Sequence, residues 1–65
     1  MKITLNGESR EVSGPSVQDA LEQIGLGTAK VATALNGDFL AAASRASTEL
    51  KKGDALEVVA PMQGG

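Results

Sequence analysis

The chain begins with a regular alternation of apolar and polar side chains. Residues 1–6 read Met-Lys-Ile-Thr-Leu-Asn, and this period of two is typical of a strand with one buried face. The pair Asn6-Gly7 follows, and both residues suit the positive φ angles of a two-residue type I′ turn. We therefore expect a β-hairpin in which residues 10–13 form the returning strand, with Val12 facing the core.

The next segment carries a helical pattern. After the break at residues 14–16 (Gly-Pro-Ser), apolar side chains recur with the spacing of one helix face. They are Val17, Ala20, Leu21 and Ile24. Ser16 is expected to be the N-cap, and Asp19 stands in the first turn, where the helix dipole favours a negative charge. Gly25, as the C′ residue, and Gly27 are expected to end the helix. Because about eight residues are too few for a stable isolated helix, this one must pack on a sheet.

Residues 31–40 predict a second hairpin. Val-Ala-Thr-Ala-Leu at 31–35 is an almost continuous apolar run, typical of a well-covered strand, and its pattern leaves the inward face open. Asn36-Gly37 repeats the turn signal, and residues 38–40 are expected to pair briefly beyond it. Phe39, the single aromatic residue, is expected in the core or at its rim.

The segment that follows has the weakest pattern in the chain. Its alanines favour a helix, whereas its serines and its threonine compete for backbone hydrogen bonds. We expect residues 41–50 to be an irregular connection with one helical turn, with Leu50 under the sheet. Residues 51–54 (Lys-Lys-Gly-Asp) predict a solvated turn in which Gly53 supplies a positive φ.

The last strand is expected at residues 55–60 and has two distinct faces. Leu56 and Val58 lie on one face, and Glu57 and Val59 lie on the other. If the first pair faces the helix, Val59 is exposed. A single exposed valine is ordinary on a protein surface. Next to the flexible side chain of Met62, however, Val59 is a candidate for docking a partner.

The order of these elements predicts an α+β fold. A hairpin, a helix that crosses one face and then further strands give a mixed sheet of four to five strands covered by one main helix. Because crossover connections join parallel strands, the first and last strands are expected to be parallel neighbours in the middle of the sheet. This arrangement is the β-grasp, or ubiquitin-like, roll.

The composition excludes several classes of function. The 65 residues contain no Cys and no His, and the eight acidic residues are scattered, so neither a thiolate nor a clustered metal site is expected. One aromatic residue and a net charge of −2 argue against nucleic-acid binding. There is no run of membrane-spanning length and no signal-peptide pattern, so we expect a cytoplasmic protein that is monomeric when free. An independent enzyme is the least expected reading.

Residues 61–65 (Pro-Met-Gln-Gly-Gly) are expected to be a flexible tail beyond a domain at residues 1–60. Pro61 has no N–H, so the sheet ladder is expected to stop there. An extended tail could reach roughly 16–18 Å. Gly64 and Gly65 have no side chain and would fit a narrow channel. The Gly65 carboxylate is therefore a candidate substrate for another enzyme, although a Gly-Gly end can also arise from composition alone.

Five stretches, taken in their order, resemble the ThiS family, the sulfur carrier proteins of thiamine biosynthesis. They are residues 1–7, 16–21, 31–37, 50–59 and 63–65. No single stretch is specific, but the order, the length and the final Gly-Gly together are. Residues 41–48 depart from the more polar or aromatic segment that family members often carry.

The resemblance implies a carrier that is acted on by partner enzymes. An adenylyltransferase of the ubiquitin-activating kind (ThiF-type), using ATP and Mg²⁺, would convert the Gly65 carboxylate to an acyl-adenylate. A sulfur donor such as a cysteine desulfurase would then supply sulfur for a thiocarboxylate, which thiazole synthase (ThiG-type) would consume. Gly64 and Gln63 would thread the tail into both enzymes, while Val59, Pro61 and Met62 would dock on them. The chain itself would bind no cofactor or metal and supply no catalytic residue.

Three alternatives remain open at this stage, and one of them is a protein modifier that would use the same tail to form isopeptides with lysines, as ubiquitin does. The small subunit of molybdopterin synthase is a carrier of similar build with the same Gly-Gly end, but it is usually longer and richer in aromatic residues near the tail. A non-catalytic β-grasp binding module would use the domain and not the tail. Removal of Gly64 and Gly65 would inactivate a carrier and leave such a module working.

Overall fold

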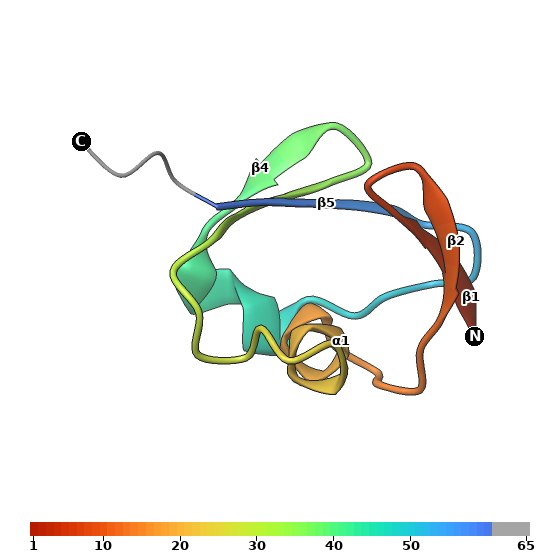
Figure 1. Cartoon of the computed structure of the whole chain (residues 1–65), viewed down its shortest axis with the longest axis horizontal. Helices are drawn as coiled ribbons and strands as arrows, with labels where there is room; N and C mark the ends of the chain where they lie inside the picture. The colour runs from red at the N-terminus through yellow and green to blue at the C-terminus, as the bar shows by residue number, and fades with distance from the viewer. Residues whose placement is uncertain (61–65) are drawn as a thin grey trace.

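In the computed structural model, which describes residues 1–60, five strands form one mixed sheet (Figure 1). The strands are β1 (Lys2–Leu5), β2 (Glu8–Glu11), β3 (Ala32–Leu35), β4 (Asp38–Leu40) and β5 (Ala55–Val59). Their order in the sheet is β2-β1-β5-β3-β4, and β1 pairs with β5 in parallel while the other neighbours are antiparallel. The predicted mixed sheet with parallel first and last strands at its centre is confirmed.

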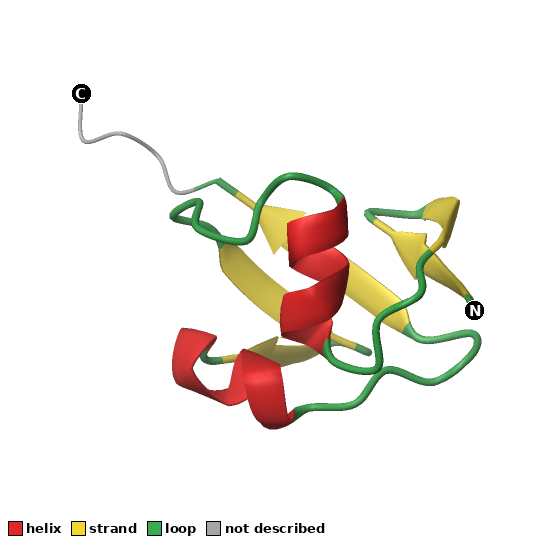
Figure 2. Cartoon of the chain, turned by 90° about the horizontal axis from the view of Figure 1, so that it is seen from below, coloured by secondary structure: helices red, strands yellow, loops and turns green. Residues whose placement is uncertain are grey.

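Two helices lie on the same face of this sheet. They are α1 (Val17–Gln23) and the 3-10 helix η1 (Ala42–Ser47), which contact each other. Figure 2 shows α1 crossing the sheet with η1 beside it. Within residues 1–60, no segment covers the opposite face, which is called the outer face below (Figure 1). No helix among the described residues has both the length and the apolar character that crossing a membrane requires.

The two Asn-Gly pairs form the hairpin turns that the sequence predicts. Asn6 and Gly7 have φ angles of 50° and 84°, and Asn36 and Gly37 have angles of 53° and 88°. The predicted returning strand at 10–13 was placed two residues too late, because a two-residue turn brings Glu8 directly opposite Leu5. β2 therefore ends at Glu11, and Val12 is buried just beyond the strand.

The start of α1 is fixed by a capping box. The Asp19 N–H donates to Ser16 Oγ at 3.1 Å, and the Ser16 N–H donates to Asp19 Oδ2 at 3.2 Å. Gly14 packs closely on this turn, since a Cβ there would clash with the Asp19 Cβ and lie 3.2 Å from the Ala20 nitrogen. Gly25 follows the C-cap with a φ of 85°, as predicted for a C′ glycine.

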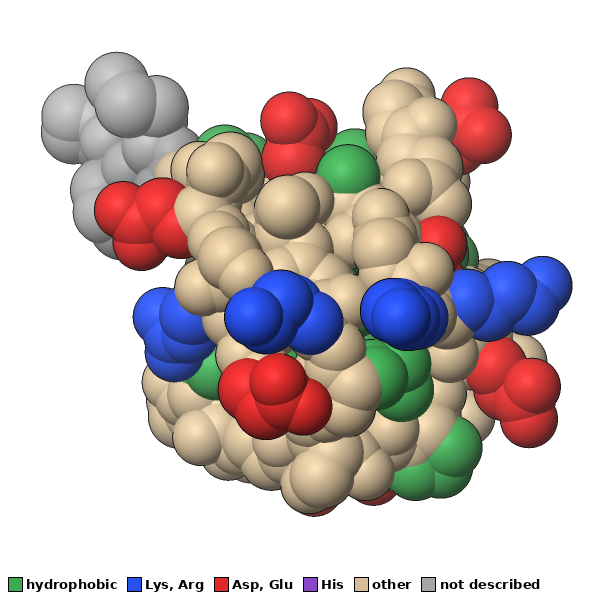
Figure 3. Space-filling view, turned by 90° about the vertical axis from the view of Figure 1, so that its right-hand side faces the viewer, with side chains coloured by type: hydrophobic (Ala, Val, Ile, Leu, Met, Phe, Trp, Pro, Cys, Tyr) green, Lys and Arg blue, Asp and Glu red, His purple; other side chains and the backbone are tan. Residues whose placement is uncertain are grey.

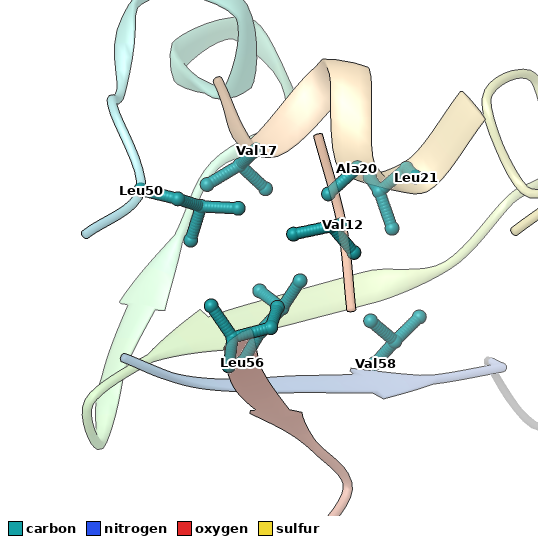
Figure 4. Packing of buried hydrophobic residues seen from close by; sticks show 8 residues of the cluster. Val12, Val17, Ala20, Leu21, Leu50, Leu56 and Val58 are labelled. Atoms are coloured by element: carbon teal, nitrogen blue, oxygen red, sulfur yellow. The ribbon is translucent and has the colours of Figure 1, made fainter. Parts of the chain in front are cut away.

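The core lies between α1 and the inner face of the sheet (Figure 4). Its buried apolar residues are Ile3, Val12, Val17, Ala20, Leu21, Leu50, Leu56 and Val58. The apolar stripe of the helix and the inward face of the last strand are thus confirmed, although Ile24 is only partly buried. Complete burial of Leu21 or Leu56 stabilises the fold by about 1.5–3 kcal/mol each.

Besides the N-cap Ser16, two polar residues are buried, and the sequence pattern did not single out either one. Thr33 is 2% exposed and faces the core between Val31 and Leu35, which settles the inward face that the sequence left open. Arg45 of η1 is 7% exposed. The predicted irregular link at 41–50 with one helical turn contains a longer helical segment, the six residues of η1, and its buried arginine is a finding of the structure.

Candidate functional site

The last described strand leads directly to the predicted tail. β5 is the central strand, with β1 on one side and β3 on the other, and it ends at Val59. The pairing of Val59 with Ala32 holds this end of β5 in the sheet. The predicted site residues Pro61, Met62, Gln63, Gly64 and Gly65 lie outside the described residues. Val59 is therefore the one predicted site residue that the structure places.

Val59 lies on the outer face of the sheet and is 59% exposed. This agrees with the predicted alternation, in which Leu56 and Val58 face the core. The side chain stands one residue before the end of the described chain.

Phe39 is also on the outer face, and its predicted place in the core or at its rim was wrong. It is 77% exposed. Its partner across the ladder is Ala34, whereas its neighbour Leu40 pairs with the buried Thr33. Because successive residues of a strand point to opposite faces, the inward position of Leu40 places Phe39 outside. The sequence contained this alternation, but the general tendency of phenylalanine to be buried outweighed it.

The outer face thus carries a small apolar surface, which we call the outer patch and define as Ala32, Ala34, Phe39 and Val59. The ladder registers place Ala32 beside Val59, and Ala34 between Phe39 on β4 and Glu57 on β5. Phe39 and Val59 are the two large apolar side chains that are exposed within residues 1–60. Glu57 stands opposite Ala34 and is exposed, so an acidic residue borders this apolar surface.

A different side of the molecule carries mixed charge. Figure 3 shows a row of Lys and Arg side chains there, with Asp and Glu side chains above and below it. Lys51 and Lys52 are exposed in the turn that leads to β5, and the Gly53 N–H donates to the Lys2 carbonyl at 2.9 Å. The predicted solvated turn is confirmed, and Gly53 has a φ of 88°.

Asp54 closes this turn and is held as a carboxylate. The Asn36 side-chain amide donates to Asp54 Oδ1 at 3.1 Å, and the Lys51 N–H donates to Oδ2 at 2.8 Å. These two hydrogen bonds, the one from Asn36 foremost, lower the pKa of Asp54 below its ordinary value. Asp54 therefore anchors the start of β5 to the β3–β4 turn.

The described residues offer surfaces and not an enclosed reaction site. Residues 1–60 form no pocket, and among them no three His, Cys, Asp or Glu side chains gather as a metal site. What this part of the chain presents is a central strand with a neighbour on each side and an apolar outer patch beside its end. Such an arrangement can bind a protein surface.

The ThiS family model matches residues 3–65 of the chain. The chain is 38% identical over 63 residues to the sulfur carrier protein ThiS of Thermus thermophilus, covering 97% of this chain and 98% of that protein. It is also 36% identical over 66 residues to a thiazole synthase of Paramagnetospirillum magneticum. That alignment covers 100% of this chain and 20% of the longer protein.

Solved structures agree with these sequence matches. The crystal structure of the thiamine biosynthesis protein ThiS from Geobacter metallireducens superposes with a TM-score of 0.85 at 33% identity, covering 100% of both chains. The solution structure of a thiamine biosynthesis protein from the same organism gives a TM-score of 0.77 at 33% identity, covering 100% of this chain and 88% of that one. The predicted β-grasp fold is thereby confirmed.

Proposed function

This chain belongs to the ThiS family of sulfur carrier proteins in thiamine biosynthesis, and from that premise we propose that the carboxylate of Gly65 is the group that carries the sulfur. The observation that supports this most directly is the extent of the family match, which runs from residue 3 through Gly64 and Gly65. As a member of the family, the chain is a carrier and not a catalyst.

The proposed chemistry follows from the low reactivity of a carboxylate. A carboxylate is a poor electrophile, so an adenylyltransferase of the ubiquitin-activating kind first joins the Gly65 carboxylate to AMP, using ATP and Mg²⁺. The mixed anhydride has a good leaving group. The outer sulfur of a persulfide on a donor such as a cysteine desulfurase displaces AMP to give an acyl disulfide, and a thiol reductant then cleaves the S–S bond to leave the thiocarboxylate on Gly65. ATP and Mg²⁺ belong to the activating enzyme, and this chain binds neither of them.

The proposed acceptor of the sulfur is a thiazole synthase. One protein named thiazole synthase contains a segment that is similar to the whole of this chain. Covalent linkage of two domains in one protein is an arrangement that favours their mutual contact, because it raises the effective concentration of each near the other. Of the two sulfur carriers that the sequence leaves open, the family match favours the thiamine carrier over the molybdopterin one.

Docking on these partners is assigned to the outer patch and the first tail residues. Val59 supplies an exposed apolar side chain at the end of β5, and Phe39 extends the same surface across β3. Pro61 and Met62 would continue this surface, while Gln63 and Gly64 would pass through the narrow entrance of a partner's active site. Tyr, Trp and Phe are enriched in the buried centre of protein interfaces, which suits Phe39 to this role.

Intact mass measurement tests the proposal. The chain is incubated with ATP, Mg²⁺, a ThiF-type adenylyltransferase and a sulfur source, and the product is weighed and mapped. We expect a gain equal to one oxygen-to-sulfur exchange, located on the C-terminal peptide. A chain lacking Gly64 and Gly65 is the matched control and should gain nothing. An unchanged mass with partners that do modify a known carrier would contradict the proposal.

A further inference from the structure

The central strand β5 loses its β1 neighbour before it reaches the tail. β1 pairs with β5 through Thr4 opposite Ala55 and Leu5 opposite Leu56, and the chain then turns away at Asn6-Gly7. The Asn6 N–H still donates to the Leu56 carbonyl at 3.0 Å. In a regular parallel ladder, the carbonyl of Asn6 would next accept from the Val58 N–H. The positive φ of Asn6 turns the backbone away from β5, so the Val58 N–H needs another acceptor.

The side chain of Asn6 supplies the hydrogen bonds that the β1–β5 ladder lacks at Val58. Its Oδ1 accepts a hydrogen bond from the Val58 N–H at 2.8 Å, and its Nδ2 donates to the Val58 carbonyl at 3.0 Å. A primary amide offers one acceptor and two donors in a plane, so it can replace a strand neighbour for one residue. Val58 is also paired with Thr33 of β3 on its other edge, and its side chain is in the core. The backbone of Val58 is therefore held by Asn6 on the β1 side, and its side chain is held by the core, three residues before Pro61.

Asn36 is the structural counterpart of Asn6 at the opposite end of β5. It occupies the same position in the second hairpin turn, with a φ of 53° against 50° for Asn6. Its N–H donates to the Ala55 carbonyl at 2.7 Å, and its Oδ1 accepts from the Ala55 N–H at 2.9 Å. The two turn asparagines thus hold the same strand with similar bonds. Only Asn6 acts near the tail, because Ala55 lies about 10 Å further back along the strand.

We infer that Asn6 is a positioning residue for the sulfur carrier: by fixing the backbone of Val58, it sets where and in which direction the tail leaves the domain, and hence how Gly65 enters a partner's active site. The inference rests on the proposed function. Reaction rates are sensitive to the placement of the reacting group, and a shift of about 1 Å can cost about 100-fold in rate. If the backbone of Val58 were not fixed, the tail would leave the domain in many directions, whereas the outer patch would stay intact.

The test compares Asn6→Gly with Asn36→Gly. Glycine accepts the positive φ of both turns, so each variant loses only its side-chain hydrogen bonds. With a ThiF-type adenylyltransferase, pyrophosphate release is measured over a range of carrier concentrations. We expect Asn6→Gly, which loses both side-chain hydrogen bonds to Val58, to lower kcat by about tenfold because Gly65 is placed less precisely, with KM changed by less than about twofold. Asn36→Gly should leave kcat within about twofold.

Amide exchange gives a readout that does not depend on the partner. The Val58 N–H should exchange about tenfold faster in Asn6→Gly, and the Ala55 N–H should do so in Asn36→Gly. Asn6→Asp keeps the acceptor for the Val58 N–H but sets a carboxylate oxygen against the Val58 carbonyl, so its kcat should fall as well. This second variant keeps the inference testable if Asn6→Gly does not fold.

Two outcomes separate the inference from the proposed function. If both glycine variants lose kcat in proportion to their loss of unfolding free energy, Asn6 is a structural residue and the inference is overturned alone. If the wild-type chain releases no pyrophosphate with an enzyme that is active on a known carrier, the proposed function fails and the inference fails with it.

Discussion

The hydroxyl of Thr33 and the guanidinium of Arg45 meet inside the domain, where Arg45 Nε donates to Thr33 Oγ1 at 3.0 Å. The same hydroxyl donates to the Leu40 carbonyl at 2.8 Å, and Arg45 Nη2 donates to the Val31 carbonyl at 2.6 Å. Arg45 thus links η1 to β3 by hydrogen bonds, and the hydroxyl of Thr33 links β3 to β4. Burying the Arg45 guanidinium beside uncharged oxygens costs free energy unless its N–H donors have hydrogen-bond partners. The fold is therefore stable only while this network is intact.

Thr33→Val should therefore destabilise the domain by about 1–3 kcal/mol, although valine has a similar shape and is more apolar. The replacement leaves Arg45 Nε buried without its acceptor. Urea unfolding measures the effect. Thr33→Ser is the control, because it keeps the hydroxyl, and it should lose about 1 kcal/mol for the missing methyl group. In the double variant Thr33→Val with Arg45→Met, the loss should be smaller than the sum of the single losses. Additive losses would show that the two side chains do not depend on each other.

The outer patch can be tested by changing Phe39 and Val59 separately. Both side chains are mostly exposed, so Phe39→Ser and Val59→Asp should change the unfolding free energy by less than about 1 kcal/mol. Each should weaken binding to the adenylyltransferase and to thiazole synthase by at least about tenfold, measured by titration calorimetry. Lys30→Ser, an exposed change in the loop after α1, is the control and should bind normally. Wild-type affinity in both patch variants would rule out the outer patch as the docking surface.

Gly65→Ala should impair activation far more than it impairs folding. The described core consists of residues from Ile3 to Val58, whereas the proposed reaction takes place at the carboxylate of residue 65. A methyl group on its Cα would crowd the narrow partner channel that we propose for the glycines. We expect at least a tenfold loss in the rate of adenylation with a Tm within about 2 °C of the wild type. A parallel loss of Tm and of activation would show that the effect comes from folding.

The free energy of unfolding should depend on pH through Asp54, which stands directly before the start of β5. Hydrogen bonds from Asn36 and from the Lys51 N–H lower the pKa of this carboxyl in the folded state. Its contribution is therefore present above the unfolded pKa of about 3.9 and is lost as the pH falls through the folded value. Asp54→Ala should cost less than about 1 kcal/mol at pH 7, because the carboxyl is exposed, and still less at about pH 2.5. Lys52→Ala in the same turn should show no such acid dependence. Equal losses for Asp54→Ala at both pH values would contradict this assignment.

The sequence by itself determined the elements and their order. Both Asn-Gly turns, the cap at Ser16, the stripe of α1 and the alternation of β5 are local features, because turn chemistry and side-chain periodicity act over a few residues. The family likeness was also readable from the sequence, since it rests on short stretches in a fixed order. The β2 bounds were misplaced because the length of a turn fixes the register, and the strand was assigned from its apolar residue alone.

Tertiary structure alone decided which positions share a surface or a hydrogen bond. Phe39 joins Val59 on the outer patch because β3 stands between β4 and β5. Arg45 is buried because η1 places it over Thr33, 12 residues away in the chain. Asn6 reaches Val58 across 52 residues because β1 runs parallel to β5 and stops short of the tail. No local pattern contains such contacts, because they depend on the packing of strands that are far apart in the sequence.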